Sequence, residues 1–125
     1  MNRTLTFAAL GFALALSAPA FAGGNVEAGQ KAAAPCAACH GVDGNPAADA
    51  PQYPRLAGQY RDYLEQALKE YRDGKRKNPI MAGFTQVKNA DGEFTMTDQA
   101  IADLALYFAS LPGKLGDVHD NVQGN

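Results

Sequence analysis

Cys36-Ala37-Ala38-Cys39-His40 is the stretch of sequence around which the rest of this chain is organised. Two thiols are separated by two residues, and an imidazole follows the second thiol directly. Within one helical turn, positions i, i+3 and i+4 lie on the same face. Cys36, Cys39 and His40 can therefore be directed at one flat ligand. The chain has only these 2 cysteines, so no thiol remains for a disulfide elsewhere.

This spacing is the one used to attach a c-type haem, with thioethers from the two thiols and the histidine on the iron. A thioredoxin-like pair would follow a strand, and no strand pattern precedes Cys36. A structural zinc site needs about four ligands, and the other histidine, His119, lies in a polar segment. A disulfide loop this short would stabilise the chain little. We therefore predict one covalent haem c on Cys36 and Cys39, with His40 as an axial ligand.

The first 22 residues have the pattern of an export signal. Arg3 supplies positive charge, 5–16 is an apolar run, and Ala20-Phe21-Ala22 matches a small-x-small cleavage site. The apolar run is shorter than the ~20 residues that a membrane-spanning helix needs. We predict a cleaved signal peptide and a periplasmic protein, because bacterial c-type haem is attached outside the cytoplasmic membrane. A retained anchor is the alternative.

The remaining chain is long enough for one domain, predicted over 23–113 and followed by a polar, flexible tail over 114–125. No later segment is apolar enough for stable membrane insertion. Asn25 caps a first helix, which Pro35 bends or ends near Ala34. Thr97 caps the last helix, and residues 82–95 are predicted to be irregular. Between them lies an amphipathic helix with an apolar stripe. That stripe is formed by Tyr60, Tyr63, Leu64, Ala67, Leu68 and Tyr71.

Together these segments resemble the class I c-type cytochromes, and most of all one half of a bacterial dihaem cytochrome c. The likeness covers nearly all of the chain after the signal, and the matching segments are 36–41, 53–59, 71–76, Met81 and 101–108. The resemblance implies an all-α fold of three to five helices around one haem. It also implies that the first and last helices cross, with Gly29 against the ring of Tyr107.

The resemblance assigns the haem surroundings to Pro54, Arg55 and Leu56. The Pro54 carbonyl would accept a hydrogen bond from the His40 ring and so fix its tautomer. Leu56 would pack on the porphyrin. Arg55 is a candidate partner for a haem propionate, and the alternative for Arg55 is a solvated surface position.

Met81 is the predicted second axial ligand, and a His/Met pair suits electron transfer. It lies in a segment expected to be an irregular loop that reaches across the haem face. Met1 leaves with the signal, and Met96 precedes the cap Thr97, where an apolar residue often packs on the first helical turn. His119 and Met96 are the alternatives to Met81, and filling a core gap is the structural alternative for Met81 itself.

A filled His/Met site predicts a soluble one-electron carrier rather than an enzyme, with donor and acceptor proteins as partners, possibly membrane oxidoreductases. A haem subunit of a larger oxidoreductase and a haem ligand sensor or peroxidase are the alternatives. After the predicted cleavage, which removes Arg3 with the signal peptide, the chain has 10 basic and 13 acidic side chains. This acidic balance argues against nucleic-acid binding. The basic run over 72–77 is either a docking site beside the haem edge or a solvated face.

Overall fold

The computed structural model describes residues 23–113; the predicted signal peptide, the predicted tail and His119 lie outside the described residues. The described part is all-α, as the sequence predicted, and its β-structure is one isolated antiparallel bridge between Lys88 and Phe94. Its elements are α1 (Val26–Ala32), a 3-10 turn η1 (Ala34–Cys36), α2 (Ala37–His40), α3 (Arg61–Arg72), α4 (Pro79–Thr85) and α5 (Asp98–Ser110). Within residues 23–113, no helix has the length and apolar content to cross a membrane.

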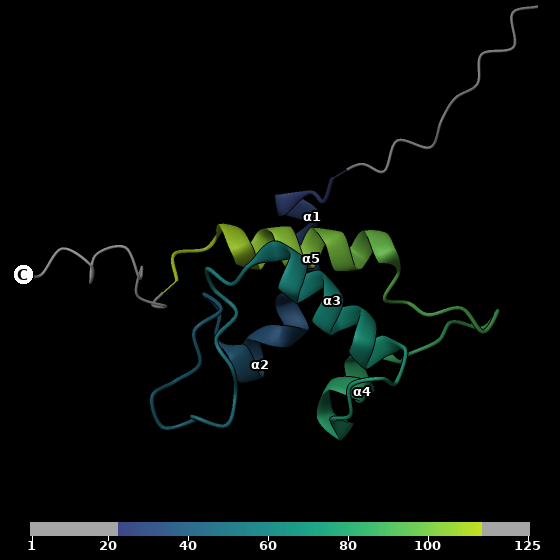
Figure 1. Ribbon diagram of the computed structural model, residues 1–125, viewed down its shortest axis with the longest axis horizontal. Helices are drawn as coiled ribbons and strands as arrows, with labels where there is room; N and C mark the ends of the chain where they lie inside the picture. Colours follow the sequence, from purple (N-terminus) through teal and green to yellow (C-terminus); the bar gives the residue numbers. More distant parts are fainter. Residues whose placement is uncertain (1–22, 114–125) are drawn as a thin grey trace, which may run out of the picture.

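Helices α1 and α5 pack across one another at one end of the molecule (Figure 1). Both begin at the predicted caps: the Asn25 side chain accepts from the Ala28 amide, and Thr97 accepts from the Ala100 amide. Gly29 lies at the crossing, as expected. The three atoms nearest to a Cβ at this position would be the oxygen and carbon of the Asp103 carbonyl and the Cβ of Tyr107, so the backbone of α5 limits the approach together with Tyr107.

Helix α1 ends at Ala32, and Pro35 lies in the first turn of η1, which leads directly into α2. The predicted break near Ala34 is therefore confirmed, and it has a simple cause. Proline has no amide hydrogen and disfavours a helical conformation in the residue before it. The chain restarts as a tighter turn, which carries Cys36 into α2.

Helix α3 buries Leu64 and packs against α5. The predicted apolar stripe extended one residue too far at its amino end. Tyr60 caps the helix in an extended conformation and is 79% exposed, so it is not part of the core. Gly74 follows the carboxyl end with a φ of 73°, a conformation that glycine adopts without strain.

The largest error of the sequence prediction concerns residues 79–85, which form α4 and not an irregular loop. Asn78 caps this helix, since its side chain accepts from the amides of Ile80 and Met81, and Pro79 occupies the first turn. An asparagine followed by proline is a typical helix start. That signal was present in the sequence and was missed.

The buried core lies between α1, α3 and α5. It consists of Ala33, Leu64, Leu104, Ala105, Tyr107 and Phe108. Cys36, Leu56, Leu68 and Met96 are partly buried against this core. These four side chains also line the cavity described next, so the core and the site share one wall.

Candidate functional site

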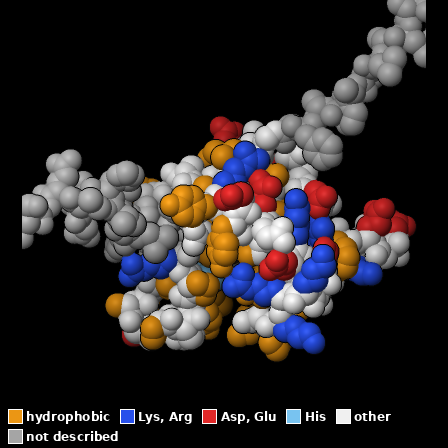
Figure 2. Space-filling model, in the orientation of Figure 1, with side chains coloured by type: hydrophobic (Ala, Val, Ile, Leu, Met, Phe, Trp, Pro, Cys, Tyr) orange, Lys and Arg blue, Asp and Glu red, His pale blue; other side chains and the backbone are white. Residues whose placement is uncertain are grey.

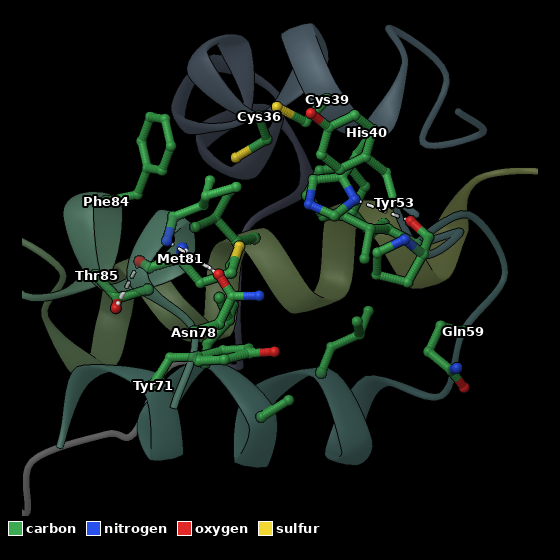
Figure 3. Close-up of a pocket in the computed structure, with 18 of the residues that line it drawn as sticks. Cys36, Cys39, His40, Tyr53, Gln59, Tyr71, Asn78, Met81, Phe84 and Thr85 are labelled. Carbon is green, nitrogen blue, oxygen red and sulfur yellow. Dashed lines mark hydrogen bonds between the residues drawn. The ribbon is translucent and has the colours of Figure 1, made fainter. Parts of the chain in front are cut away.

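A cavity of about 370 Å³ opens between α2, α3, α4 and the loop that joins α2 to α3. Figure 2 shows hydrophobic side chains along a hollow at the lower edge of the molecule, with Lys and Arg side chains beside it over α3 and α4. The lining brings together residues distant in the sequence, including Cys36, Cys39, His40 and Met81. All four side chains can be followed in Figure 3.

His40 is held at the carboxyl end of α2 by two contacts. Its Nδ1 atom lies 2.8 Å from the backbone oxygen of Pro54, and its ring meets that of Tyr53 edge-on, with centroids 6.3 Å apart. A carbonyl can only accept, so Nδ1 carries the proton and the lone pair is left on Nε2. The hydrogen bond predicted between Pro54 and His40 is therefore present, and it leaves one ring nitrogen able to bind a metal ion.

Cys36 and Cys39 carry free thiols and line the cavity on the same side as α2 (Figure 3). Burial raises the pKa of the Cys36 thiol, and repulsion from Cys39 raises it further. A raised pKa disfavours the thiolate that a thioredoxin-like pair uses for attack. Within the described residues, no cluster of three or more His, Cys, Asp or Glu side chains could hold a metal ion.

Met81 reaches the cavity from the first turn of α4 (Figure 3). Asn78 fixes the backbone there by accepting from the Met81 amide at 3.1 Å. One turn later the hydroxyl of Thr85, which is fully buried, donates to the Met81 carbonyl at 2.9 Å. The backbone of Met81 is thus bound on both sides. Neither Asn78 nor Thr85 was predicted to belong to the site.

Met96 also lines the cavity, where it packs against the buried core from the segment before α5. The sequence predicted a structural contact with the last helix for Met96, and its packing against the core agrees with a structural role. Both methionines nevertheless face the same space. The choice of Met81 as the iron ligand therefore stays a prediction, and it is tested by substitution below.

Arg55, Leu56 and Pro54 all line the cavity, Leu56 partly buried and Arg55 exposed. The predicted basic run over 72–77 is divided by the fold. Arg76 lines the cavity, whereas Arg72 turns toward the start of α5 and donates to Asp98 at 2.6 Å. The Arg72 side chain is 15% exposed, so it does not form one exposed basic patch with the rest of the run, and a docking role for Lys75, Arg76 and Lys77 stays a prediction.

These residues fit a haem c. The lining is mainly apolar, it places two thiols and an imidazole side by side, and a thioether faces the same space. Among residues 23–113, no aspartate, glutamate or lysine contributes to the lining, and its cations are Arg55 and Arg76. A porphyrin is an apolar plate with two carboxylates, so this chemistry suits it.

Comparison with known proteins agrees with the geometry. The model of the family described as Cytochrome c matches residues 26–112. Cytochrome c4 of Pseudomonas aeruginosa is 39% identical over 122 residues, which are 98% of this chain and 55% of that protein. Cytochrome c-554(548) of Halomonas halodenitrificans is 44% identical over 87 residues, which are 70% of this chain and 96% of that protein.

The solved structure of reduced recombinant cytochrome c4 from Pseudomonas stutzeri superimposes with a TM-score of 0.62 at 38% identity. The match covers 74% of this chain and 48% of that one. The chain thus spans about half the length of the cytochrome c4 relatives, and nearly the whole length of cytochrome c-554(548).

Proposed function

This chain belongs to the cytochrome c family, and we propose that it is a periplasmic one-electron carrier with a single covalent haem c. The observation that carries the proposal is that Cys36, Cys39, His40 and Met81 line one cavity although they come from η1, α2 and α4. Cys36 and Cys39 would hold the haem as thioethers, and His40 and Met81 would be its axial ligands.

The bound haem supplies an iron that gains and loses one electron. The role of the protein is to hold that iron still and to keep other ligands away. The Pro54 carbonyl orients the His40 ring, while Asn78 and Thr85 fix the backbone of Met81. With His40 and Met81 both bound to the iron, no position would be left for oxygen or peroxide, and a fixed ligand set would need little rearrangement on electron transfer.

The apolar wall favours the reduced state. Leu64, Leu68, Leu104 and Phe108 come from α3 and α5 and exclude water from their side of the cavity. A low-dielectric surrounding disfavours the additional positive charge of ferric iron, and a thioether ligand acts in the same direction. We therefore expect a positive reduction potential and exchange of electrons with redox proteins through the exposed edge of the cavity.

The test begins with the protein expressed in a host that matures c-type cytochromes. Denaturing electrophoresis with haem staining should show a coloured band, because thioethers survive denaturation, and Cys36→Ser with Cys39→Ser should abolish it. The intact mass should correspond to a chain beginning at Gly23 plus one haem. A colourless native protein would overturn the proposal, and an uncleaved amino terminus would overturn the signal peptide.

A second measurement separates a carrier from a ligand sensor or peroxidase. The ferrous protein is mixed with carbon monoxide at neutral pH. A carrier with both axial positions filled should bind the gas slowly or not at all. Rapid binding would favour the sensor or peroxidase, because it requires an open position on the iron.

A further inference from the structure

The charged side chains of the cavity lining are unbalanced. Among the described residues the lining contains two guanidinium groups, those of Arg55 and Arg76, and no carboxylate. Both side chains are exposed, so they lie at the open rim of a largely apolar space. A haem c, which the proposed function requires, brings two propionate carboxylates.

The direction of those carboxylates follows from the attachment. The vinyl-bearing pyrrole rings of a porphyrin lie opposite the rings that carry the propionates. A haem attached to Cys36 and Cys39 would therefore direct its propionates to the opposite wall. In Figure 3 the two thiols lie on one side of the cavity, and Tyr71 of α3 and Gln59 lie across from them.

Arg76 is held at that opposite wall by two phenol rings. Both of its terminal nitrogens donate to the Tyr63 hydroxyl at 3.4 Å, and its guanidinium carbon lies 5.0 Å from the centroid of the Tyr71 ring. Stacking on the Tyr71 face and the contact with Tyr63 use one face and the edge between the two terminal nitrogens, and the edge that includes Nε can make a planar, two-point contact with a carboxylate. Hydrogen bonding to Tyr63 raises the pKa of Arg76, so the group stays cationic.

We propose that Arg76, clamped by Tyr63 and Tyr71, is the partner of one haem propionate and a positioning residue that sets the reduction potential. The inference rests on the proposed haem attachment. It adds to the sequence prediction, which considered only Arg55 for this role. Arg76 lies on the segment between α3 and α4, so the same contact would connect the carboxyl end of α3 to the haem.

The test is a redox titration of the haem-loaded wild type and of Arg76→Gln between about pH 5 and pH 9. Loss of the cation should make electron uptake roughly tenfold less favourable, which is about 59 mV for a one-electron couple. It should also raise the propionate pKa, which Arg76 otherwise holds low. The potential of the variant should then fall as the pH rises through neutrality, while that of the wild type stays flat.

Lys75→Gln is the matched control, because it removes the same charge from an exposed neighbour outside the cavity lining. Its shift should be small and independent of pH. Equal shifts with equal pH dependence in the two variants would overturn the inference, because only long-range charge would then be acting.

Arg76→Lys is the second variant, and it keeps the charge but not the two-point contact. Its propionate bending band in resonance Raman spectra should move relative to the wild type, and an unmoved band would overturn the inference. Failure of the proposed function would look different. The preparation would then be colourless. If this inference alone failed, the protein would show a normal c-type spectrum, and Arg76→Gln would leave its reduction potential unchanged.

Discussion

At the scale of single residues, the site depends on backbone groups that fix side-chain chemistry. The Pro54 carbonyl places the proton of His40 on Nδ1, and the Thr85 hydroxyl and Asn78 side chain hold the backbone on either side of Met81. None of these groups would touch the reacting iron. They reduce the freedom of the two proposed ligands, so an axial bond would cost little entropy to form.

Met81→Ala should abolish the weak long-wavelength absorption of a ferric iron–methionine bond and let the ferrous protein bind carbon monoxide rapidly. Visible spectroscopy checks both effects. Met96→Ala is the matched control, because Met96 lines the same cavity. It should keep the absorption and lose on the order of 1–2 kcal/mol of stability, since Met96 is only partly buried. The opposite pattern would assign the ligand to Met96.

At the scale of elements, the crossing of α1 and α5 requires a residue without a side chain. The backbone of Asp103 and the Cβ of Tyr107 occupy the space that a Cβ of Gly29 would need, with 2.7 Å to the latter. The buried Asp103 carboxylate also accepts from the Asn25 amide at 2.7 Å and so ties the start of α1 to α5. Backbone atoms of a packed helix cannot rotate away, so this contact has little tolerance.

Gly29→Ala should therefore destabilise the protein by about 1–3 kcal/mol, although alanine favours a helix by roughly 1 kcal/mol over glycine. Denaturant unfolding of the haem-loaded protein measures the difference. Gly83→Ala in α4 is the control, because a Cβ there meets nothing within 4 Å. It should gain roughly 0.5–1 kcal/mol. A stabilised Gly29→Ala variant would contradict the close crossing.

A second link between elements joins α3 to α5. Arg72 donates to Asp98 at 2.6 Å and to the Met96 carbonyl at 3.3 Å, and this pairing holds the pKa of Asp98 below its usual range. A lowered folded-state pKa contributes stability above the ordinary aspartate pKa and loses it as the pH falls through the folded value. The Asp98 side chain is 67% exposed, so the contribution is below about 1 kcal/mol.

Asp98→Asn should reduce stability near neutral pH by that small amount and leave a smaller loss of stability below about pH 4 than in the wild type. Thermal unfolding at a series of pH values measures both effects. Asp91→Asn in the exposed turn after α4 serves as the control, and it should change neither. An acid profile identical to that of the wild type would mean that the ion pair with Arg72 contributes no stability.

At the scale of the whole molecule, the basic side chains are concentrated in the part of the chain that contributes much of the cavity lining. The chain has eight basic and four acidic side chains over 55–88, but one basic and six acidic over 89–125. Arg72 is paired with Asp98 and Arg76 faces the cavity, which leaves Lys75 and Lys77 as exposed charges on this segment. They lie shortly before α4, whose Met81 lines the cavity, and we expect them to contact an acidic redox partner.

Lys75→Gln combined with Lys77→Gln should slow electron exchange with an acidic redox protein several-fold at low salt, and the difference should disappear as salt screens the charges. Stopped-flow kinetics at several ionic strengths measure the effect. Lys31→Gln with Lys88→Gln removes the same net charge from exposed positions in α1 and after α4, outside the segment between α3 and α4, and should have less effect. Equal rates for both double variants would exclude a docking role for Lys75 and Lys77.

The short-range features of the fold were predictable because they depend on neighbouring residues. The spacing of Cys36, Cys39 and His40 predicts one covalent haem c, Pro35 breaks the first helix, and Asn25 and Thr97 cap their helices. Each involves residues within about one helical turn of each other, where covalent geometry leaves few conformations. Family resemblance added the Pro54 contact with His40, which spacing alone does not predict.

Only tertiary packing decided which distant groups meet. The sequence by itself determined a c-type haem motif and an all-α chain with a methionine available to the iron. The structure decided that Arg76 faces the cavity while Arg72 pairs with Asp98, that both Met81 and Met96 reach the same space, and that Tyr60 stays in solvent. Which of these side chains face the cavity depends on how α3, α4 and α5 pack against one another. Two residues of the same type can have similar neighbours in the sequence and still differ in their contacts, because those contacts are made with other helices.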